Sequence, residues 1–300
     1  MIFPEEKRVR MACAKMLVDP SNARSYDMLL TGCRSIGRNL IRFYHIIPPT
    51  SERMVYKTYD GSGMISFDRT IAECCKNGKT IESMITYHRV RDVKKVRLAI
   101  LYDDSNSMTA WWRKQAQMQD IDESEAPQTY AKIACLSMME GLGKDIDINF
   151  WKFGSQSHGP FNMSSNMYRE IIRCNGSGGT RLDLALESLI EHKWYHRPGM
   201  KIVMILTDGI PEAGHSAYSE DVLINMKTLG LIKNLMRNKI HVIYIQMLTD
   251  ESRKFKKSGG YTLLEFGNEI QQMGCEYITV NSKASLMRTL FEGLNTINKI

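Results

Sequence analysis

The chain has 300 residues, of which 43% are hydrophobic and 24% are charged, a composition that allows a sizeable folded core. Its longest purely apolar stretches have about five residues, and its N-terminus lacks a basic-then-apolar signal pattern, so we expect a cytoplasmic protein without membrane contact. The formal net charge of +7 lies in the first third, where residues 1–95 hold 17 Lys and Arg against 10 Asp and Glu, which leaves 23 against 23 for the rest.

The first third of the chain reads as a basic, mainly helical accessory region, residues 1–95. Residues 4–17 and 25–44 carry helical periodicity, Pro48 and Pro49 break the chain, and residues 68–76 form one more short helix before Asn77 and Gly78. This region is too short to promise a hydrophobic core of its own, so we expect it to pack against residues 96–300. Its charge fits a docking surface for nucleic acid or an acidic protein, and equally an Arg-rich face in solvent.

From Val96 onward, short apolar runs alternate with amphipathic stretches, a pattern typical of a parallel sheet covered on both faces. We predict strands over residues 96–102, 147–153, 202–207, 240–247 and 276–280. We predict helices over residues 128–141, 181–196, 220–238, 262–273 and 283–298. Asn238 and Gly274 lie where two of these helices are expected to end. The fold class is therefore α/β, a doubly wound, mostly parallel, Rossmann-like sheet with helices on both faces, over residues 96–300.

Two of the predicted strands end in acidic turns. The first runs into Asp103 and the serines Ser105 and Ser107, and another runs into Asp208 within a Thr-Asp-Gly turn. A glycine-rich loop ending in Thr180 lies between them in sequence. If the two strands are neighbours, their carboxyl ends bring these side chains to one edge of the sheet, where α/β folds place ligands.

The residue types at this edge are those that a hard divalent cation requires. Magnesium prefers near-octahedral oxygen coordination, which the hydroxyls of Ser105, Ser107 and Thr180 supply as neutral ligands. Asp103 and Asp208 then contact the ion directly or through bound water. With little anionic charge around it, the cation remains electrophilic toward an outside carboxylate. We predict Mg²⁺ at these five residues, with Mn²⁺ or Ca²⁺ as the alternative ions.

These three segments resemble the metal-ion-dependent adhesion site of von Willebrand factor A (VWA) domains, at Asp103, Ser105, Ser107, Thr180 and Asp208. Asp68-Arg69-Thr70, the basic stretch from Arg89 to Arg97 and the first metal loop follow one another in that order. In this order, residues 60–108 look most like the intracellular CoxE-like proteins encoded beside MoxR-type AAA+ ATPases. The resemblance implies a VWA domain over residues 96–300. The usual glycine between the serines is Asn106 here, and asparagine is the residue that best replaces glycine at positive φ. The extra acid, Asp104, is expected to face solvent, with a contribution to cation affinity as the alternative.

Other chemistries have weaker support. The glycine-rich loop before Thr180 lacks the lysine and the preceding strand of a phosphate-binding loop, and neither metal-loop serine sits in a nucleophile elbow. His192 and His196 are spaced as a helical pair without the Glu of a zinc protease motif. The seven cysteines are scattered without a Cys-x-x-Cys pair, which favours reduced thiols. We therefore expect a non-enzymatic protein with no catalytic residues.

The leading hypothesis is a magnesium-dependent protein–protein interaction module that captures an Asp or Glu of its partner at the metal site. The resemblance implies a MoxR-type AAA+ ATPase as partner, in the assembly or remodelling of a client complex. One alternative is a nucleic-acid-associated scaffold that uses the basic first third. Another is a metal-chelatase subunit. Trp111 and Trp112, just after the first metal loop, are candidates for an aromatic contact beside the ion.

Overall fold

The chain divides into two compact units in the computed structural model. One unit comprises residues 1–47 together with 95–300, and the other comprises residues 48–94. The structure describes residues 6–44, 50–58, 64–77, 85–93, 96–110, 122–142, 146–162, 165–196, 198–214, 218–247 and 257–280. The helix predicted over 283–298, and both Trp111 and Trp112, lie outside these ranges.

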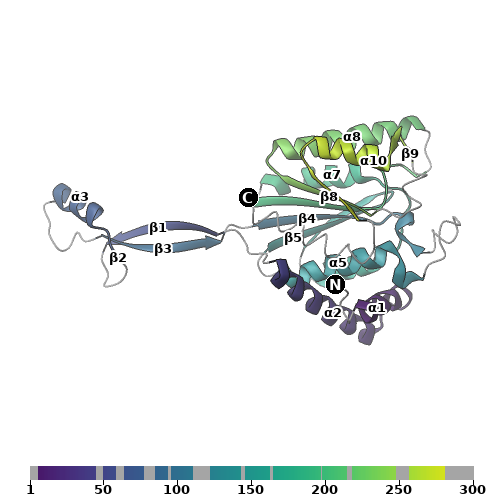
Figure 1. The fold of residues 1–300 in the computed structure, drawn as a ribbon, viewed down its shortest axis with the longest axis horizontal. Coiled ribbons are helices and arrows are strands. Elements are labelled where there is room, and N and C mark those ends of the chain that lie inside the picture. Colours follow the sequence, from purple (N-terminus) through teal and green to yellow (C-terminus); the bar gives the residue numbers. More distant parts are fainter. Residues whose placement is uncertain are drawn as a thin grey trace. The chain divides into compact units, whose positions relative to one another are not determined.

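A six-stranded sheet forms the centre of the first unit (Figure 1). Its order is β11 (Glu276–Val280), β8 (His241–Met247), β7 (Met200–Thr207), β4 (Val96–Asp103), β5 (Ile146–Phe153) and β6 (Ser157–Asn162). All neighbours pair in parallel except β6, which pairs with β5 in antiparallel orientation. Counted along the chain this is the doubly wound order 3-2-1-4-5-6, so the predicted fold class is confirmed.

Helices cover both faces of this sheet, and the alternation of side chains along each strand explains why. In β4, Leu98, Ile100 and Tyr102 enter one hydrophobic cluster, while Ala99 and Leu101 enter the other. Every residue of β4 is buried, which is why residues 98–102 in its middle form a continuous apolar run.

The two sets of helices lie on opposite sides of the sheet (Figure 1). One face carries α5 (Pro127–Leu142), α6 (Ser165–Arg173), and the N-terminal helices α1 (Glu6–Val18) and α2 (Ala23–Tyr44). The other face carries α7 (Leu182–Glu191), α8 (Tyr218–Arg237) and α10 (Leu263–Gln272). Short elements complete the unit: the 3-10 turns η1 (Asn106–Met108), η2 (Glu123–Glu125) and η3 (Trp194–His196), and the strands β9 (Lys257–Ser258) and β10 (Tyr261–Thr262).

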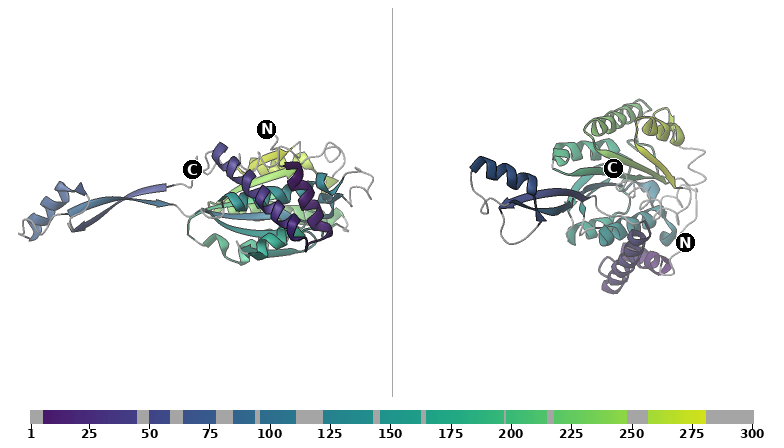
Figure 2. Two further views of the ribbon diagram at one scale, coloured as in Figure 1. Left: turned by 90° about the horizontal axis from the view of Figure 1, so that it is seen from below. Right: turned by 60° about the vertical axis from the view of Figure 1, so that its left-hand side comes forward.

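The N-terminal helices belong to the sheet unit, which differs from the predicted division at residue 95. Leu29, Cys33 and Ile36 of α2 are at most 1% exposed and join the same cluster as α5 and the sheet. Figure 2 shows α1 and α2 side by side on this layer. An amphipathic helix pair has no core of its own, so its apolar stripe is buried against α5.

The close approach of α2 and α5 depends on two glycines. A Cβ atom on Gly37 would overlap the carbonyl oxygen of Ser137 and lie 3.2 Å from the backbone nitrogen of Gly141. A Cβ atom on Gly141 would in turn lie 3.2 Å from the carbonyl carbon of Gly37. The backbones of the two helices therefore touch at this crossing.

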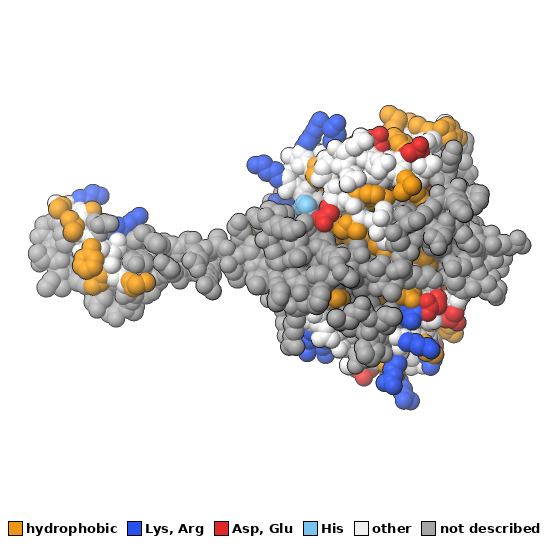
Figure 3. Space-filling view, in the orientation of Figure 1, with side chains coloured by type: hydrophobic (Ala, Val, Ile, Leu, Met, Phe, Trp, Pro, Cys, Tyr) orange, Lys and Arg blue, Asp and Glu red, His pale blue; other side chains and the backbone are white. Residues whose placement is uncertain are grey.

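The second unit is a small antiparallel sheet with one helix. Strand β3 (Ile85–Val93) lies between β1 (Thr50–Thr58) and the short β2 (Met64–Ile65), and α3 (Phe67–Asn77) follows β2. The helix was predicted at 68–76, but the strands were not, so "mainly helical" is wrong for residues 48–94. Phe67 and Ile71 of α3 are 72% and 60% exposed, and Figure 3 shows hydrophobic side chains gathered on this unit.

The predicted strands from Val96 onward are confirmed to within two residues, as are the helices at 128–141, 220–238 and 262–273. Helix α8 ends directly before Asn238, and Gly274 follows α10 with a φ of 90°. The helix predicted over 181–196 ends at Glu191 instead. Strand β6 and helix α6 were missed. None of the described helices has both the length and the apolar character required to cross a membrane.

Candidate metal centre

The candidate site lies where the order of the sheet reverses. The chain proceeds from β4 to β5 on one side and returns to place β7 on the other, so β4 and β7 are adjacent and parallel. Tyr102 is level with Leu206 in this pairing, so Asp103 and Thr207 come level at the carboxyl ends. The Thr207 hydroxyl donates a hydrogen bond to Asp103 Oδ2 at 2.5 Å. This switch point is where doubly wound sheets bind their ligands.

Four of the five predicted ligands are joined by direct contacts. The backbone N–H of Ser105 donates to Asp103 Oδ1 at 2.8 Å. The hydroxyl oxygens of Ser105 and Ser107 lie 3.0 Å apart, and the Ser107 hydroxyl donates to Asp208 Oδ1 at 2.7 Å. Asp103, Ser105, Ser107 and Asp208 are thus linked by hydrogen bonds between two loops, through side-chain oxygens from Ser105 to Asp208 and through the Ser105 backbone N–H to Asp103.

Thr180 joins this group through the backbone. Its N–H donates to the Glu212 carbonyl at 2.9 Å, and the Glu212 N–H donates to the Thr180 carbonyl at 3.1 Å. Glu212 belongs to the loop that follows Asp208, so Thr180, which is 2% exposed, is fixed to the segment that carries that carboxylate. A structural role for Glu212 was not predicted, because its contribution is a backbone pairing that leaves no side-chain signal.

The loop before Thr180 also pairs with the first metal loop. The Asn106 N–H donates to the Gly178 carbonyl at 3.0 Å, and the Gly178 N–H donates back to Asn106 Oδ1 at 3.2 Å. Asn106 lies in a 3-10 turn and has a negative φ, so the predicted positive φ is wrong. Asparagine is useful here because its side-chain oxygen accepts a hydrogen bond from the neighbouring loop.

Burial and like charge dominate the electrostatics of the site. Asp103 is 0% exposed and Asp208 is 1% exposed. Burial, followed by the charge of Asp208, raises the pKa of Asp103 to about 7, although hydrogen bonds from Thr207 and Ser105 oppose this shift. A cation is favoured beside two buried carboxylates at one edge of the sheet, because a divalent ion offsets both the repulsion between them and the cost of their desolvation.

Asp104 is buried, not exposed as predicted, with 7% of its surface accessible. Its Oδ1 accepts a hydrogen bond from the Gly176 N–H at 2.9 Å, and its carbonyl accepts one from the Ser177 N–H at 2.6 Å. Burial raises the pKa of the Asp104 carboxyl, while the hydrogen bond from Gly176 opposes that rise. Asp104 therefore holds the glycine-rich loop beside the site.

Two buried polar side chains of α5 support the same loop and were missed from the sequence. Gln128 Nε2 donates to the Cys174 carbonyl at 2.9 Å, and Lys132 Nζ donates to the carbonyls of Ile172, at 2.9 Å, and Cys174. Both side chains are at most 1% exposed. A lysine among the apolar residues of a buried helix was the signal that could have identified this support.

The donor set fits a small, hard cation. Hydroxyl and carboxylate oxygens suit Mg²⁺ or Mn²⁺ rather than soft metals. Oxygen ligands about 2.1 Å from an octahedral ion lie about 2.9 Å from each other, whereas the longer bonds of Ca²⁺ place them about 3.4 Å apart. The separations of 3.0 Å and 2.7 Å are ordinary hydroxyl hydrogen-bond lengths, which keep these oxygens close enough to share one cation. Across the described ranges, no group of three His, Cys, Asp or Glu side chains is placed to hold a metal.

Fold and site together define a doubly wound α/β domain with an oxygen-rich candidate metal centre at its topological switch point. No protein-family model matches the chain. The curated proteins contain no matching relative either.

Several solved structures are similar over much of the chain. A variant of the PilB minor pilin from Streptococcus sanguinis is 12% identical, with a TM-score of 0.49 over 84% of this chain and 80% of that one. Manganese-loaded TRAP protein from Plasmodium vivax is 13% identical, with a TM-score of 0.41 over 82% and 78%. Proximal thread matrix protein 1 from the mussel byssus, with a zinc-occupied MIDAS motif, is 16% identical, with a TM-score of 0.41 over 68% and 46%.

Proposed function

We propose that this chain is a non-enzymatic, Mg²⁺-dependent protein–protein interaction module that captures an Asp or Glu side chain of its partner. The observation that carries the proposal is the convergence of two loops: the Ser105 and Ser107 hydroxyls and an Asp208 carboxylate oxygen lie in contact, and the Ser105 backbone N–H holds the Asp103 carboxylate beside them. When bound, the cation supplies an electrophilic coordination position for a partner carboxylate.

The protein residues hold this site in place. Ser105 and Ser107 would provide neutral ligands, and Thr180 would complete them from the loop fixed to Glu212. The backbone of Ser105 and the hydroxyl of Thr207 orient the Asp103 carboxylate. Because the neutral ligands do not quench the charge of the cation, the preference for an external carboxylate follows from the chain's own donor set.

The resemblance of residues 60–108 to CoxE-like proteins suggests the finer assignment. We propose a MoxR-type AAA+ ATPase as the partner, in the assembly or remodelling of a client complex. The ATPase activity would then belong to the partner, since the glycine-rich loop of this chain lacks the lysine of a phosphate-binding loop.

Affinity purification of the full chain from its native lysate tests this function. A partner should co-elute in Mg²⁺, and it should be lost in EDTA and with Ser105→Ala, which removes one hydroxyl and keeps the backbone turn. Ser188→Ala is the matched control, because the Ser188 hydroxyl lies on α7 and accepts a hydrogen bond from the Trp151 indole N–H. Partner recovery that is equal in Mg²⁺ and EDTA would refute the proposal.

A further inference from the structure

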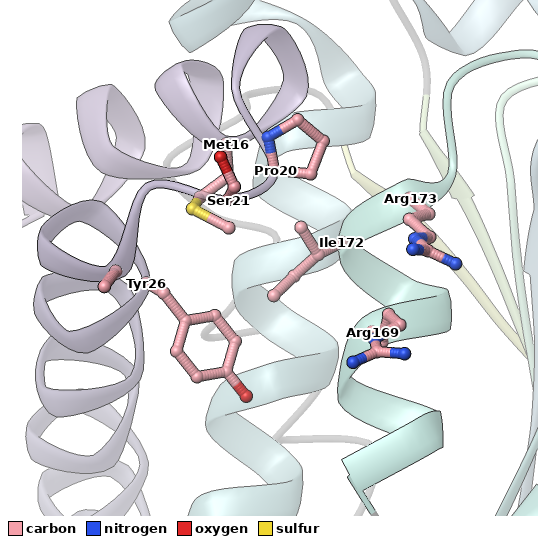
Figure 4. A pocket seen from close by; sticks show the side chains of 8 residues that line it. Met16, Pro20, Ser21, Tyr26, Arg169, Ile172 and Arg173 are labelled. Carbon is pink, nitrogen blue, oxygen red and sulfur yellow. The ribbon is translucent and has the colours of Figure 1, made fainter.

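A pocket of about 550 Å³ lies on the helical face of the first unit, away from the metal centre (Figure 4). Its walls come from the end of α1, the turn into α2 and the exposed side of α6. Exposed Pro20 and the half-buried ring of Tyr26, which carries a hydroxyl, give it apolar surface, whereas Met16 and Ile172 are each only 3% exposed. Figure 4 shows Ile172 pointing from α6 toward Tyr26. The volume is within the ~300–1,000 Å³ typical of ligand clefts.

Two arginines of α6 give this pocket a positive charge. Arg169 and Arg173 are four residues apart, so they lie one turn apart on the helix and both line the pocket. Both side chains are exposed, and neither forms an ion pair with any residue that the structure describes. No Asp or Glu is among the described lining residues.

Some other arginines of this unit form ion pairs. Arg34 donates to Glu140 at 2.7 Å, and Arg181 donates to Asp183 at 2.8 Å. The guanidinium groups of Arg169 and Arg173 are thus available to an external carboxylate. A planar guanidinium binds a carboxylate through two parallel hydrogen bonds, which gives such a contact both strength and direction.

We infer that this pocket binds an acidic peptide segment of a partner protein, with carboxylates on Arg169 and Arg173 and an apolar side chain against Pro20 and the Tyr26 ring. The apolar surface favours a peptide over nucleic acid. Single-stranded nucleic acid needs aromatic platforms for its bases, and Tyr26 is the one aromatic side chain among the described lining residues.

Helix α6 lines the pocket and leads directly into the segment that supports the metal centre. None of the five candidate metal ligands lines the pocket. Arg173 ends α6, and the next residue, Cys174, is the one whose carbonyl is held by Gln128 and Lys132. A partner could therefore engage the pocket and the metal centre as two separate contacts. Peptide binding in the pocket requires no cation, so this inference stands independently of the proposed function.

Selection of a random 12-residue peptide library on the full chain in EDTA tests the inference without the metal centre. The expected peptides carry two or more Asp or Glu residues beside a Leu, Ile, Met or Phe. A fluorescent copy of a selected peptide should bind about tenfold more weakly to Arg169→Ala and to Arg173→Ala. Replacing its Glu by Gln, and its Asp by Asn, should cause a comparable loss.

Arg237→Ala is the matched control, because Arg237 is an exposed arginine at the end of α8 on the opposite face of the sheet. Equal unfolding midpoints show that the surface variants are folded. Selection without acidic enrichment, or unchanged binding to the Arg169→Ala/Arg173→Ala double variant, overturns the inference. It is equally overturned if a 12-nucleotide single-stranded RNA binds through the two arginines and the peptides do not.

Discussion

Replacement of Gly37 by Ala tests whether the N-terminal helices are an integral part of the sheet unit. Helix propensity alone predicts that Gly37→Ala in the middle of α2 stabilises the protein by ~1 kcal/mol. Packing predicts the opposite, because the new Cβ atom would overlap the Ser137 carbonyl oxygen of α5. Backbone cannot rotate away as a flexible side chain can, so α2 would have to retreat by about 1 Å to restore an ordinary contact.

The cost of this retreat exceeds the gain in propensity. Leu29, Cys33, Ile36 and Leu40 of α2 are at most 4% exposed and pack in the shared cluster. A gap of ~0.5–1 Å removes a quarter to a half of each dispersion contact, and overpacking in cores typically costs ~1–3 kcal/mol, occasionally more. We expect Gly37→Ala to lower the free energy of unfolding by ~1–3 kcal/mol after the propensity gain is included.

Urea unfolding followed by circular dichroism measures this change, and the chain supplies a matched control. Gly230 lies inside α8, and a Cβ atom there would meet nothing within 4 Å. Gly230→Ala should therefore stabilise the protein by ~0.5–1 kcal/mol. If Gly37→Ala raises the unfolding midpoint as Gly230→Ala does, α2 does not pack on α5 as described.

Three further perturbations address the site and the helix beside it. Asp208→Asn removes the charge that disfavours ionised Asp103, so in EDTA the variant should unfold at a higher temperature than wild type. Mg²⁺ at ~100 times its Kd should stabilise wild type by ~2.7 kcal/mol but not this variant, and an equal thermal shift would contradict the assignment. Asn106→Ala removes the acceptor of the bond from the glycine-rich loop and should weaken Mg²⁺ binding by about tenfold in calorimetry; unchanged affinity would contradict that role. Burial alone would raise the pKa of Asp183, but the hydrogen bonds and charge of Arg181 lower it overall, so its stabilisation is present above its ordinary pKa of 3.8 and lost as the pH falls further. Asp183→Asn should cost ~1–3 kcal/mol at pH 7 and progressively less as the pH falls below 3.8, and a pH-independent difference in urea midpoints would exclude this ion pair.

Part of the fold follows from local sequence pattern. A strand buried on both faces is apolar at most positions, so β4 and β7 are visible as short apolar runs over residues 98–102 and 202–206. Amphipathic segments between such runs predict crossover helices, and this alternation is sufficient for a doubly wound sheet. Strand β6 could not be predicted in this way, because it is a half-exposed antiparallel edge strand without an apolar run.

The strands of residues 48–94 were invisible for a related reason. β1 and β3 pair with each other over nine residues in a small antiparallel sheet and carry no continuous apolar run. Only α3, which has helical periodicity, could be predicted in this unit. The packing of α1 and α2 on α5 also required the structure, because it depends on the contact between Gly37 and Gly141.

The sequence by itself determined the chemistry of the candidate site: acidic turns after two apolar strands, with hydroxyls at the spacing of a metal loop. The strand order then brought Asp103 and Asp208 together, because parallel neighbours end at the same edge. Only the tertiary structure decided that Asp104 is buried, that Glu212 fixes Thr180 and that Lys132 holds the glycine-rich loop. These are contacts between segments distant in sequence, made largely to backbone atoms, and backbone hydrogen bonding leaves no trace in the identity of the residue that provides it.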